Sequence, residues 1–149
     1  MKREKIMKRT IDLAISTISD GNTPFGAIVT KNGEIIAEAV NETTSSKDPT
    51  AHAELLAIRK AAKVLNSNDL SGCELYASGE PCTMCLSAIY FTGIQKVYVA
   101  YEQKEATKYN IGNPYVRQQL ALSNDKRDIR YTLLLPKGAP HPYKHWQNK

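Results

Sequence analysis

Apolar positions recur at helical spacing near the start of the chain. Across residues 3–19 they stand three or four positions apart, which places them on one face of an α-helix. The turn-forming residues DGNTP, at 20–24, end this element. Two apolar stretches within residues 25–41 then flank Asn32 and Gly33, a pair that favours a type I′ turn, so they predict a β-hairpin.

Helical and strand patterns alternate through the rest of the chain. Residues 42–50 are predicted to form a polar loop, and residues 102–114 are polar and predicted to be irregular. The other predicted elements are, in chain order, a helix from Ala51 with Thr50 as a candidate cap, a strand at 73–78, a helix at 81–93 with Pro81 in its first turn and Gly93 near its end, a strand at 96–101, a short helix at 115–122, a strand at 129–135 and a helical segment at 141–149. This alternation is typical of an α/β layered domain whose later strands are largely parallel.

Length and composition narrow the class of protein. The 149 residues suit one domain, 1–149, and 42% hydrophobic with 23% charged residues is ordinary for a soluble globular protein. No apolar run approaches the ~18–20 residues of a membrane span. The basic amino terminus is not followed by the apolar segment of a secretory signal, so we expect the protein in the cytoplasm and not in a membrane.

The net charge of +5 is concentrated at the two ends of the chain. Residues 1–10 carry a net +4 and residues 126–149 a net +5, which leaves −4 for the middle. Terminal helices with solvated charged faces explain this distribution. An RNA-binding edge is the alternative explanation.

Two groups of reactive side chains stand at predicted helix starts. His52 and Glu54 occur in TAHAE, and Cys82 and Cys85 occur in EPCTMC. Cysteines three positions apart share one helix face and can contact one metal ion, and a helix N-terminus favours the thiolate form. A redox pair gains from the same environment, so the spacing leaves a redox pair, a structural zinc site and a catalytic zinc site open.

The number of available ligands favours the catalytic zinc site. A structural zinc ion is closed by four protein ligands, and the chain has no second C-x-x-C. Cys73 begins an apolar strand and is interpreted as a buried residue, whereas His141 and His145 are interpreted as surface residues. His52 and the two cysteines then make three ligands and leave the fourth position to water, as in catalytic sites.

Glu54 stands two residues after His52. At the first turn of a helix, a metal ion just beyond the helix end lies near the axis, so His52 can bind it while Glu54 contacts the bound water. Glu54 is then a proton shuttle and not a ligand. The alternative is that Glu54 only complements the helix dipole, which is worth about 0.3–1 kcal/mol.

The combination of H-x-E at 52–54 with P-C-x-x-C at 81–85 resembles the cytidine/deoxycytidylate deaminase superfamily. The resemblance covers about residues 10–101. It points to the guanine deaminase branch and, slightly less closely, to bacterial tRNA adenosine deaminases and yeast-type cytosine deaminase. It implies a three-layer α/β/α domain with a central mixed five-stranded sheet, and a homodimer with exchange of its C-terminal segments.

The family mechanism transfers onto matching residues of this chain. The resemblance implies that His52, Cys82 and Cys85 bind one zinc ion per chain, and that zinc-activated water attacks the ring carbon that bears the amine. Glu54 would take a proton from this water, pass it to a ring nitrogen and protonate the leaving ammonia. Asn41 would hydrogen-bond the base.

Three further residues are candidates for the substrate site. The resemblance assigns Ala53 to it, and Phe25 and Phe91 are candidates to stack on the base or to form a wall around it. Core packing is the alternative role for both phenylalanines.

The substrate is expected to be a guanine-like purine, with adenosine in tRNA as the alternative. Guanine deaminases carry an acidic pair after the strand at 96–101, whereas this chain has KYNIGNPY with Asn110 and Asn113. They often have a cysteine at the position of Gly79, and they extend beyond the tryptophan that matches Trp146. The tRNA deaminases have a glycine-containing motif here that this chain lacks. A zinc-stabilised binding module without catalysis is a further alternative, which the presence of Glu54 disfavours.

Overall fold

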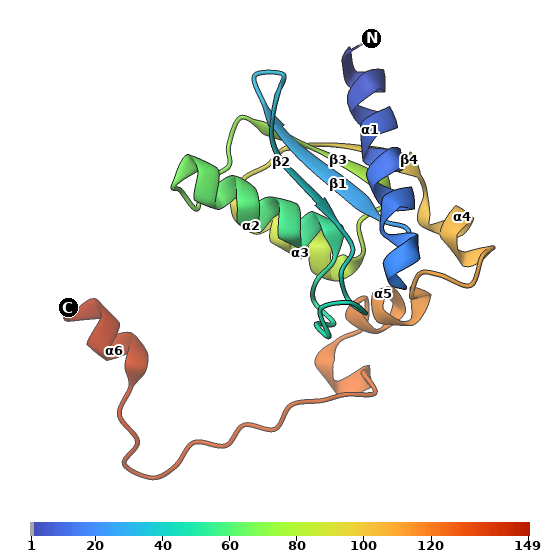
Figure 1. The fold of residues 1–149 in the computed structure, drawn as a ribbon. Helices are drawn as coiled ribbons and strands as arrows, with labels where there is room; N and C mark the ends of the chain where they lie inside the picture. The colour runs from blue at the N-terminus through green and yellow to red at the C-terminus, as the bar shows by residue number, and fades with distance from the viewer. Residues whose placement is uncertain (1) are drawn as a thin grey trace.

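A mixed β-sheet between helical layers forms the body of the molecule in a computed structural model that describes residues 2–149 (Figure 1). The sheet of these residues has four strands in the order β2-β1-β3-β4. Their bounds are Gly26–Lys31 for β1, Glu34–Val40 for β2, Cys73–Gly79 for β3 and Lys96–Tyr101 for β4. β1 pairs antiparallel with both neighbours, and β3 pairs parallel with β4. The predicted parallel pairing of the later strands is therefore confirmed for β3 and β4.

Helices cover both faces of the sheet. Helix α1, Lys2–Ser16, packs on one face against Ile28 and Tyr76. Helices α2, Ala53–Leu65, and α3, Thr83–Thr92, lie on the other face (Figure 1). The side of α2 that meets the sheet carries alanines four positions apart, at 53, 57 and 61, and all are fully buried. Small side chains at this spacing let the helix lie close to the sheet.

Local turn signals gave both right and wrong predictions. Asn32 and Gly33 both have positive φ, 51° and 79°, as the predicted type I′ turn requires. Gly93 ends α3 in the left-handed conformation, as predicted. The predicted cap at Thr50 is wrong, because its hydroxyl donates to Asp48 Oδ1 at 2.7 Å and His52 takes the N-cap position of α2.

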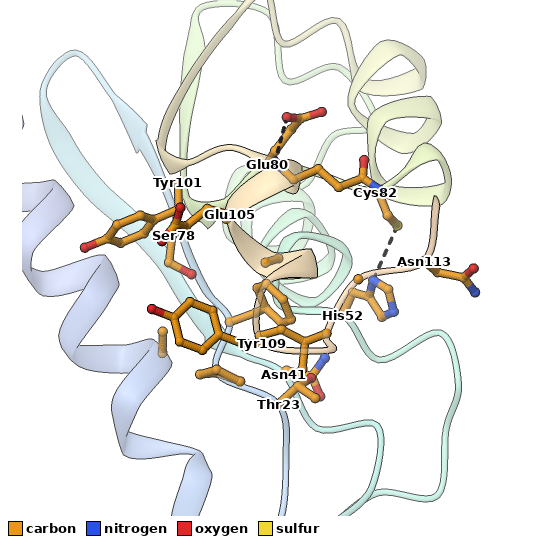
Figure 2. Close-up of a pocket in the computed structure, with 18 of the residues that line it drawn as sticks. Thr23, Asn41, His52, Ser78, Glu80, Cys82, Tyr101, Glu105, Tyr109 and Asn113 are labelled. Atoms are coloured by element: carbon orange, nitrogen blue, oxygen red, sulfur yellow. Dashed lines mark hydrogen bonds between the residues drawn. The ribbon is translucent and has the colours of Figure 1, made fainter. Parts of the chain in front are cut away.

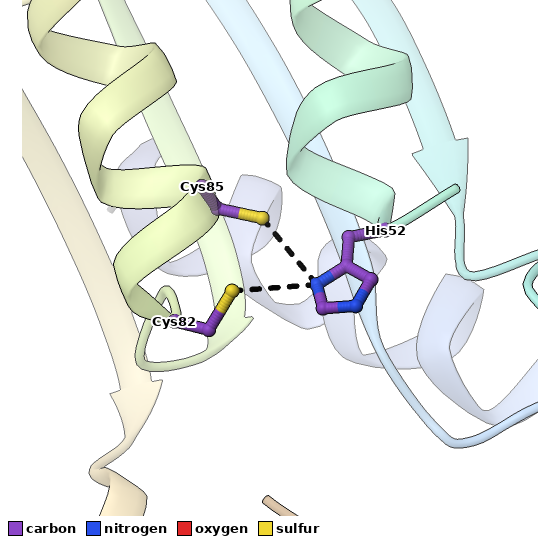
Figure 3. A group of neighbouring side chains, drawn as sticks. All are labelled: His52, Cys82 and Cys85. Atoms are coloured by element: carbon purple, nitrogen blue, oxygen red, sulfur yellow. Dashed lines mark hydrogen bonds between the residues drawn. The ribbon is translucent and has the colours of Figure 1, made fainter. Parts of the chain in front are cut away.

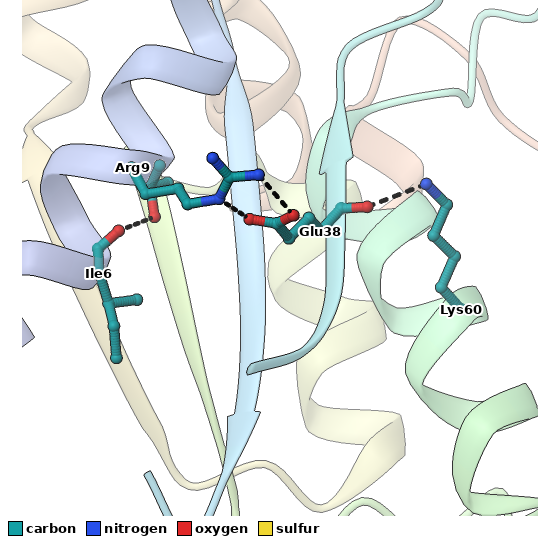
Figure 4. Close-up of polar contacts among 5 residues, drawn as sticks. Ile6, Arg9, Glu38 and Lys60 are labelled. Atoms are coloured by element: carbon teal, nitrogen blue, oxygen red, sulfur yellow. Dashed lines mark hydrogen bonds and ion pairs between the residues drawn. The ribbon is translucent and has the colours of Figure 1, made fainter. Parts of the chain in front are cut away.

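Polar contacts tie both helical layers to β2. Arg9 of α1 donates two hydrogen bonds to the Glu38 carboxylate, and Lys60 Nζ of α2 donates to the Glu38 backbone carbonyl at 2.9 Å (Figure 4). Two more cations of α1 pair with acids of the sheet, Lys2 with Glu34 and Arg3 with Glu74. Much of the amino-terminal positive charge is therefore paired within the fold, which favours the solvated-helix explanation over an RNA-binding edge at this end.

The carboxyl-terminal third departs from two predictions. A short helix, α4 at Gln103–Thr107, occurs where irregular chain was expected, and the predicted short helix forms as α5, Pro114–Leu120. The predicted strand at 129–135 is wrong, so the expected fifth strand is missing from the described residues. This segment leads away from the body to α6, Pro142–Gln147 (Figure 1). Its apolar pattern has β propensity but pairs with no sheet edge of the same chain.

Two single-turn 3-10 helices complete the described elements, at Ile18–Asp20 and Asn124–Lys126. Across residues 2–149, every helix is too short or too polar to cross a membrane.

Candidate metal centre and active site

Two helix N-termini bring the predicted metal ligands together. His52 is the N-cap residue of α2, Cys82 is the N-cap residue of α3, and Cys85 lies in the first turn of α3 (Figure 3). The backbone carbonyls of His52 and Cys82 accept the first hydrogen bonds of their helices, from Leu56 and Leu86. Each ligand is therefore held by the start of a helix that packs on the sheet.

The spacing of the ligand atoms fits zinc. His52 Nδ1 lies 3.5 Å from Sγ of Cys82 and 3.5 Å from Sγ of Cys85 (Figure 3). Zinc bonds of about 2.0–2.1 Å to nitrogen and 2.3 Å to sulfur, at a tetrahedral angle, separate these atoms by about 3.6 Å. Both separations agree with this value, and all three ligand atoms lie within 4.8 Å of one another, so the cluster suits a zinc ion.

The electrostatics of the cluster favour a cation. A hydrogen bond from the Cys85 thiol, together with His52, lowers the pKa of Cys82 to about 4. The pKa of Cys85 is raised, because its thiol donates to the Cys82 thiolate and is buried. The Cys82 thiolate also raises the pKa of His52. A metal ion takes the place of the protons in such a cluster and lets both sulfurs be thiolates.

Glu54 lies on the first turn of α2 and is only 6% exposed. Burial disfavours its charged form and raises the pKa of the carboxyl to about 7. Glu54 and His52 both line the same cavity. The structure therefore puts a carboxyl group that can hold and release a proton near neutral pH beside the metal ligands, as a proton shuttle requires.

The cavity has a volume of about 790 Å³. His52 and Asn41 lie at one end of it, and Tyr101 lies at the other, at the end of β4 (Figure 2). The wall opposite the sheet comes from the segment between α4 and α5, including Tyr109 and Asn113 (Figure 2). The cavity thus opens at the carboxyl ends of the parallel strands β3 and β4, where ligands bind in many α/β proteins.

Asn41 is oriented by its own loop. Its Oδ1 accepts hydrogen bonds from the backbone N–H of Thr43 at 3.0 Å and from the Thr43 hydroxyl at 2.9 Å. Its backbone N–H donates to Phe25 and its carbonyl accepts from Thr17, which holds the residue at the cavity wall. This arrangement leaves the Asn41 amide N–H groups as donors for a ligand.

Phe25 lines the cavity and depends on Gly79 for its position. A Cβ atom at residue 79 would lie 2.8 Å from Cε1 of the Phe25 ring, closer than such atoms approach. The glycine therefore makes room for the ring against β3. Whether Phe25 stacks on a base stays a prediction.

Phe91 does not line the cavity that one chain forms. Cys85 and Ile89 of α3 face the core one helical turn apart, and Phe91, two positions further on, points the opposite way and is 90% exposed. The prediction that it walls the pocket is wrong for the single chain. Ala53 is fully buried in the core cluster, so its side chain is also outside the cavity wall, although it lies between two residues that form it.

Sequence reasoning missed part of the cavity wall. Ile11 and Ile15 of α1 line it although they belong to the helix's apolar pattern, and Tyr101, Glu105 and Tyr109 line it from a region predicted without a role. Tyr101 ends a predicted strand that is parallel to β3. Ligands often bind at the carboxyl ends of parallel strands, so this position could have indicated that Tyr101 lines the site. Residues 105 and 109 gave no comparable signal in the pattern.

Comparison with known proteins connects this geometry to a family. Residues 1–101 match the family described as the cytidine and deoxycytidylate deaminase zinc-binding region. The chain belongs to this family. The cluster of His52, Cys82 and Cys85 is a zinc site of the type that is typical of it.

The chain is also similar to individual family members. It is 39% identical to guanine deaminase from Bacillus subtilis over 99% of this chain and 96% of the relative. The X-ray structure of guanine deaminase from Bacillus subtilis superposes with a TM-score of 0.93 at 39% identity and covers 100% of this chain and 96% of its own. A tRNA-specific adenosine deaminase from Aquifex aeolicus is 42% identical over 76% of each chain.

Proposed function

We propose that this protein is a zinc-dependent hydrolytic deaminase of a guanine-like purine base. The observation that carries the proposal is the cluster of three zinc ligands, two of which, His52 and Cys82, line one cavity together with the buried Glu54. The full-length similarity to a guanine deaminase supports the choice of substrate.

The residues of this chain divide the chemistry between them. A bound zinc ion supplies the Lewis acidity that makes water nucleophilic near neutral pH. Glu54 removes a proton from the attacking water and gives it to a ring nitrogen as the oxygen adds to the ring carbon that bears the amine. Glu54 then delivers the second proton of that water to the amine, which leaves as ammonia and leaves a carbonyl on the ring. The raised pKa of Glu54 suits a group that both accepts and donates.

Binding falls to the polar and aromatic wall of the cavity. The amide N–H groups of Asn41 donate to an oxygen or ring nitrogen of the base, because Thr43 already occupies its carbonyl oxygen. Phe25 lies against the base plane. These contacts hold the amine-bearing carbon at the zinc end of the cavity.

A free base is favoured over adenosine in tRNA. The similarity to the guanine deaminase spans 99% of this chain, whereas that to the Aquifex tRNA deaminase spans 76%. Three of the five cations of α1 are engaged with acids of the sheet, which leaves fewer of them for an RNA backbone. The positive charge near the carboxyl terminus keeps the tRNA alternative worth testing.

A substrate panel tests the proposal. Ammonia release is measured with zinc-loaded protein on guanine, isoguanine, adenine, cytosine, a pterin and a tRNA anticodon stem-loop, with Glu54→Ala as the blank. Release from guanine or another free purine supports the proposal. Turnover of the stem-loop alone would establish the tRNA deaminase, and no turnover of any compound at full zinc content would favour the silent binding module.

We further propose that residues 1–149 form one deaminase domain that acts as a homodimer with exchanged C-terminal segments. We call residues 129–149 the arm. The arm carries exposed apolar residues, with Leu133 and Leu134 both 90% exposed. β4 is an edge strand whose outer side lacks a partner among the described residues. The arm of a second copy supplies both a strand for this edge and the apolar cover that one chain does not provide.

A further inference from the structure

The cavity wall between α4 and α5 has little core packing to hold it. We call residues 108–113 the wall loop, which includes Tyr109 and Asn113 of the cavity (Figure 2). Neither α4 nor α5, on either side of it, contains a buried residue. Backbone hydrogen bonds join the loop to α4, and its other anchors are polar side-chain contacts at its two ends.

Arg117 of α5 makes those contacts. Its Nε donates to Gln103 Oε1 at 2.9 Å, which joins the segment after the wall loop to the segment before it. Its Nη2 donates to Glu80 Oε2 at 3.3 Å and to the Pro81 carbonyl at 3.4 Å. One side chain thus closes the base of the loop and attaches it to the β3–α3 connection.

Glu80 completes the connection from the other side. Its Oε1 accepts a hydrogen bond from the backbone N–H of Gln103 at 3.0 Å. The two carboxylate oxygens therefore bind Gln103, which precedes the wall loop, and Arg117, which follows it. The following residues of the same connection are Pro81 and the zinc ligand Cys82, and Figure 2 shows Glu80 beside Cys82. A shift of the wall relative to the metal centre must break this group of hydrogen bonds.

We propose that Arg117 is a positioning residue, which holds the wall loop in register with the metal centre. Arg117 itself is not part of the cavity wall, so it acts through the loop and not on the substrate. Its planar guanidinium reaches three acceptors at once, which a single lysine ammonium cannot do in the same geometry. The side chains of Arg117 and Glu80 are 42% and 34% exposed, so their ion pair contributes little to the free energy of unfolding. Its main effect is on the position of the wall loop.

The test uses zinc-loaded, full-length Arg117→Met and Arg117→Lys, and its activity readout rests on the proposed deaminase function. We expect Arg117→Met to raise KM for the base about tenfold with a smaller change in kcat, at unchanged zinc content. Arg117→Lys should recover only part of this loss. The matched control is Arg127→Met, which removes another arginine that contacts α5, through the Gln119 carbonyl, without touching Glu80.

Hydrogen exchange gives a readout that does not depend on catalysis. The backbone N–H groups of Asn110 and Ile111 are bonded to Thr107 and Ala106, and their exchange should become faster in Arg117→Met and stay unchanged in Arg127→Met. Wild-type KM together with wild-type exchange in Arg117→Met would overturn the proposal. If the wild type releases no ammonia from any substrate, the proposed function fails, and the exchange rates still decide the role of Arg117.

A double-mutant cycle covers the case in which Arg117→Met folds poorly. Glu80→Gln keeps the size of the side chain and removes its charge. If the two residues act through one contact, Arg117→Lys should increase loop exchange less in the Glu80→Gln protein than in the wild type. Additive effects would show that the two residues act separately and would contradict the proposal.

Discussion

The zinc end of the cavity and the carboxyl-terminal part of the chain are built by different means. The zinc ligands stand on α2 and α3, whose inner faces are fully buried against the sheet. Of residues 95–149, all of them described, not one is buried. The core of one chain therefore positions the reacting groups, whereas the wall loop is tied by polar side-chain contacts and the arm leaves its apolar residues exposed.

The largest effect is expected at Glu54. Glu54→Ala removes the proposed proton shuttle and should lower kcat by roughly 10²–10⁴-fold or more. Zinc content and fold should be kept, because the three ligands remain. Glu102→Ala, which removes an exposed acid near α4, is the control and should stay near wild type. An active Glu54→Ala protein would contradict the mechanism.

Loss of a zinc ligand should abolish activity and also loosen the two helix starts. Cys85→Ser should lose bound zinc and melt at a lower temperature, because metal binding to the folded site contributes to stability. Elemental analysis and thermal unfolding measure this. Cys73→Ala is the control, since Cys73 lies in β3 outside the metal cluster, and it should keep one zinc ion per chain. A metal-free wild type with a Cys82–Cys85 disulfide would instead establish the redox pair.

A substitution in the arm should change the oligomeric state of the protein and leave its zinc content unchanged. Leu134→Asp puts a charge on a segment that we propose to be covered by a second copy, so it should shift the protein from dimer to monomer in light scattering. Zinc content should not change. Val64→Asp, at an exposed apolar residue of α2, is the matched control and should remain dimeric. A wild type that is monomeric at micromolar concentration would refute the exchanged dimer.

A smaller effect on stability and on substrate binding is expected for a substitution at Gly79, which lies between the core and the cavity. Gly79→Ala forces the Phe25 ring away from β3, and such overpacking costs about 1–3 kcal/mol of unfolding free energy. The displaced ring should also raise KM for the base. Phe25→Leu provides the control background, in which the effect of Gly79→Ala on both quantities should largely disappear. Equal effects in both backgrounds would show that the ring is not responsible.

The smallest effect is expected at Glu38, which does not line the cavity. The bond from Arg9 lowers the pKa of Glu38 below its ordinary value of 4.5, so the carboxylate stabilises the fold when ionised. Glu38→Gln should therefore cost less than about 1 kcal/mol at pH 7. This difference from wild type should be full above pH 4.5 and fade as the pH falls through the lowered pKa. Urea unfolding across this range measures it, and a difference that grows toward low pH would contradict the assignment.

The parts of the fold that were predictable depend on local signals. The alternation of helices and strands up to Tyr101, the turn at Asn32 and Gly33 and the end of α3 at Gly93 follow from short-range preferences of the backbone. The strand expected at 129–135 failed because β propensity describes how side chains fit a sheet, and pairing needs an edge that the single chain does not bring to this segment.

The candidate site divides in the same way. The spacing of His52, Cys82 and Cys85 was enough to predict an open zinc site, because the residue types and helix starts limit the chemistry. The outward direction of Phe91, the room that Gly79 leaves for a ring and the attachment of the wall loop by Arg117 were not predictable. Each depends on which residues distant in sequence come to lie beside one another.

The sequence by itself determined which residues bind zinc. Zinc binding needs a histidine nitrogen and cysteine sulfurs at helix starts, and few other side chains can replace them. The shape of the cavity, the raised pKa of the buried Glu54 and the exposed state of the arm were decided only by tertiary packing. Burial and direction are properties of the folded neighbourhood, and no local pattern specifies which surface a side chain will meet.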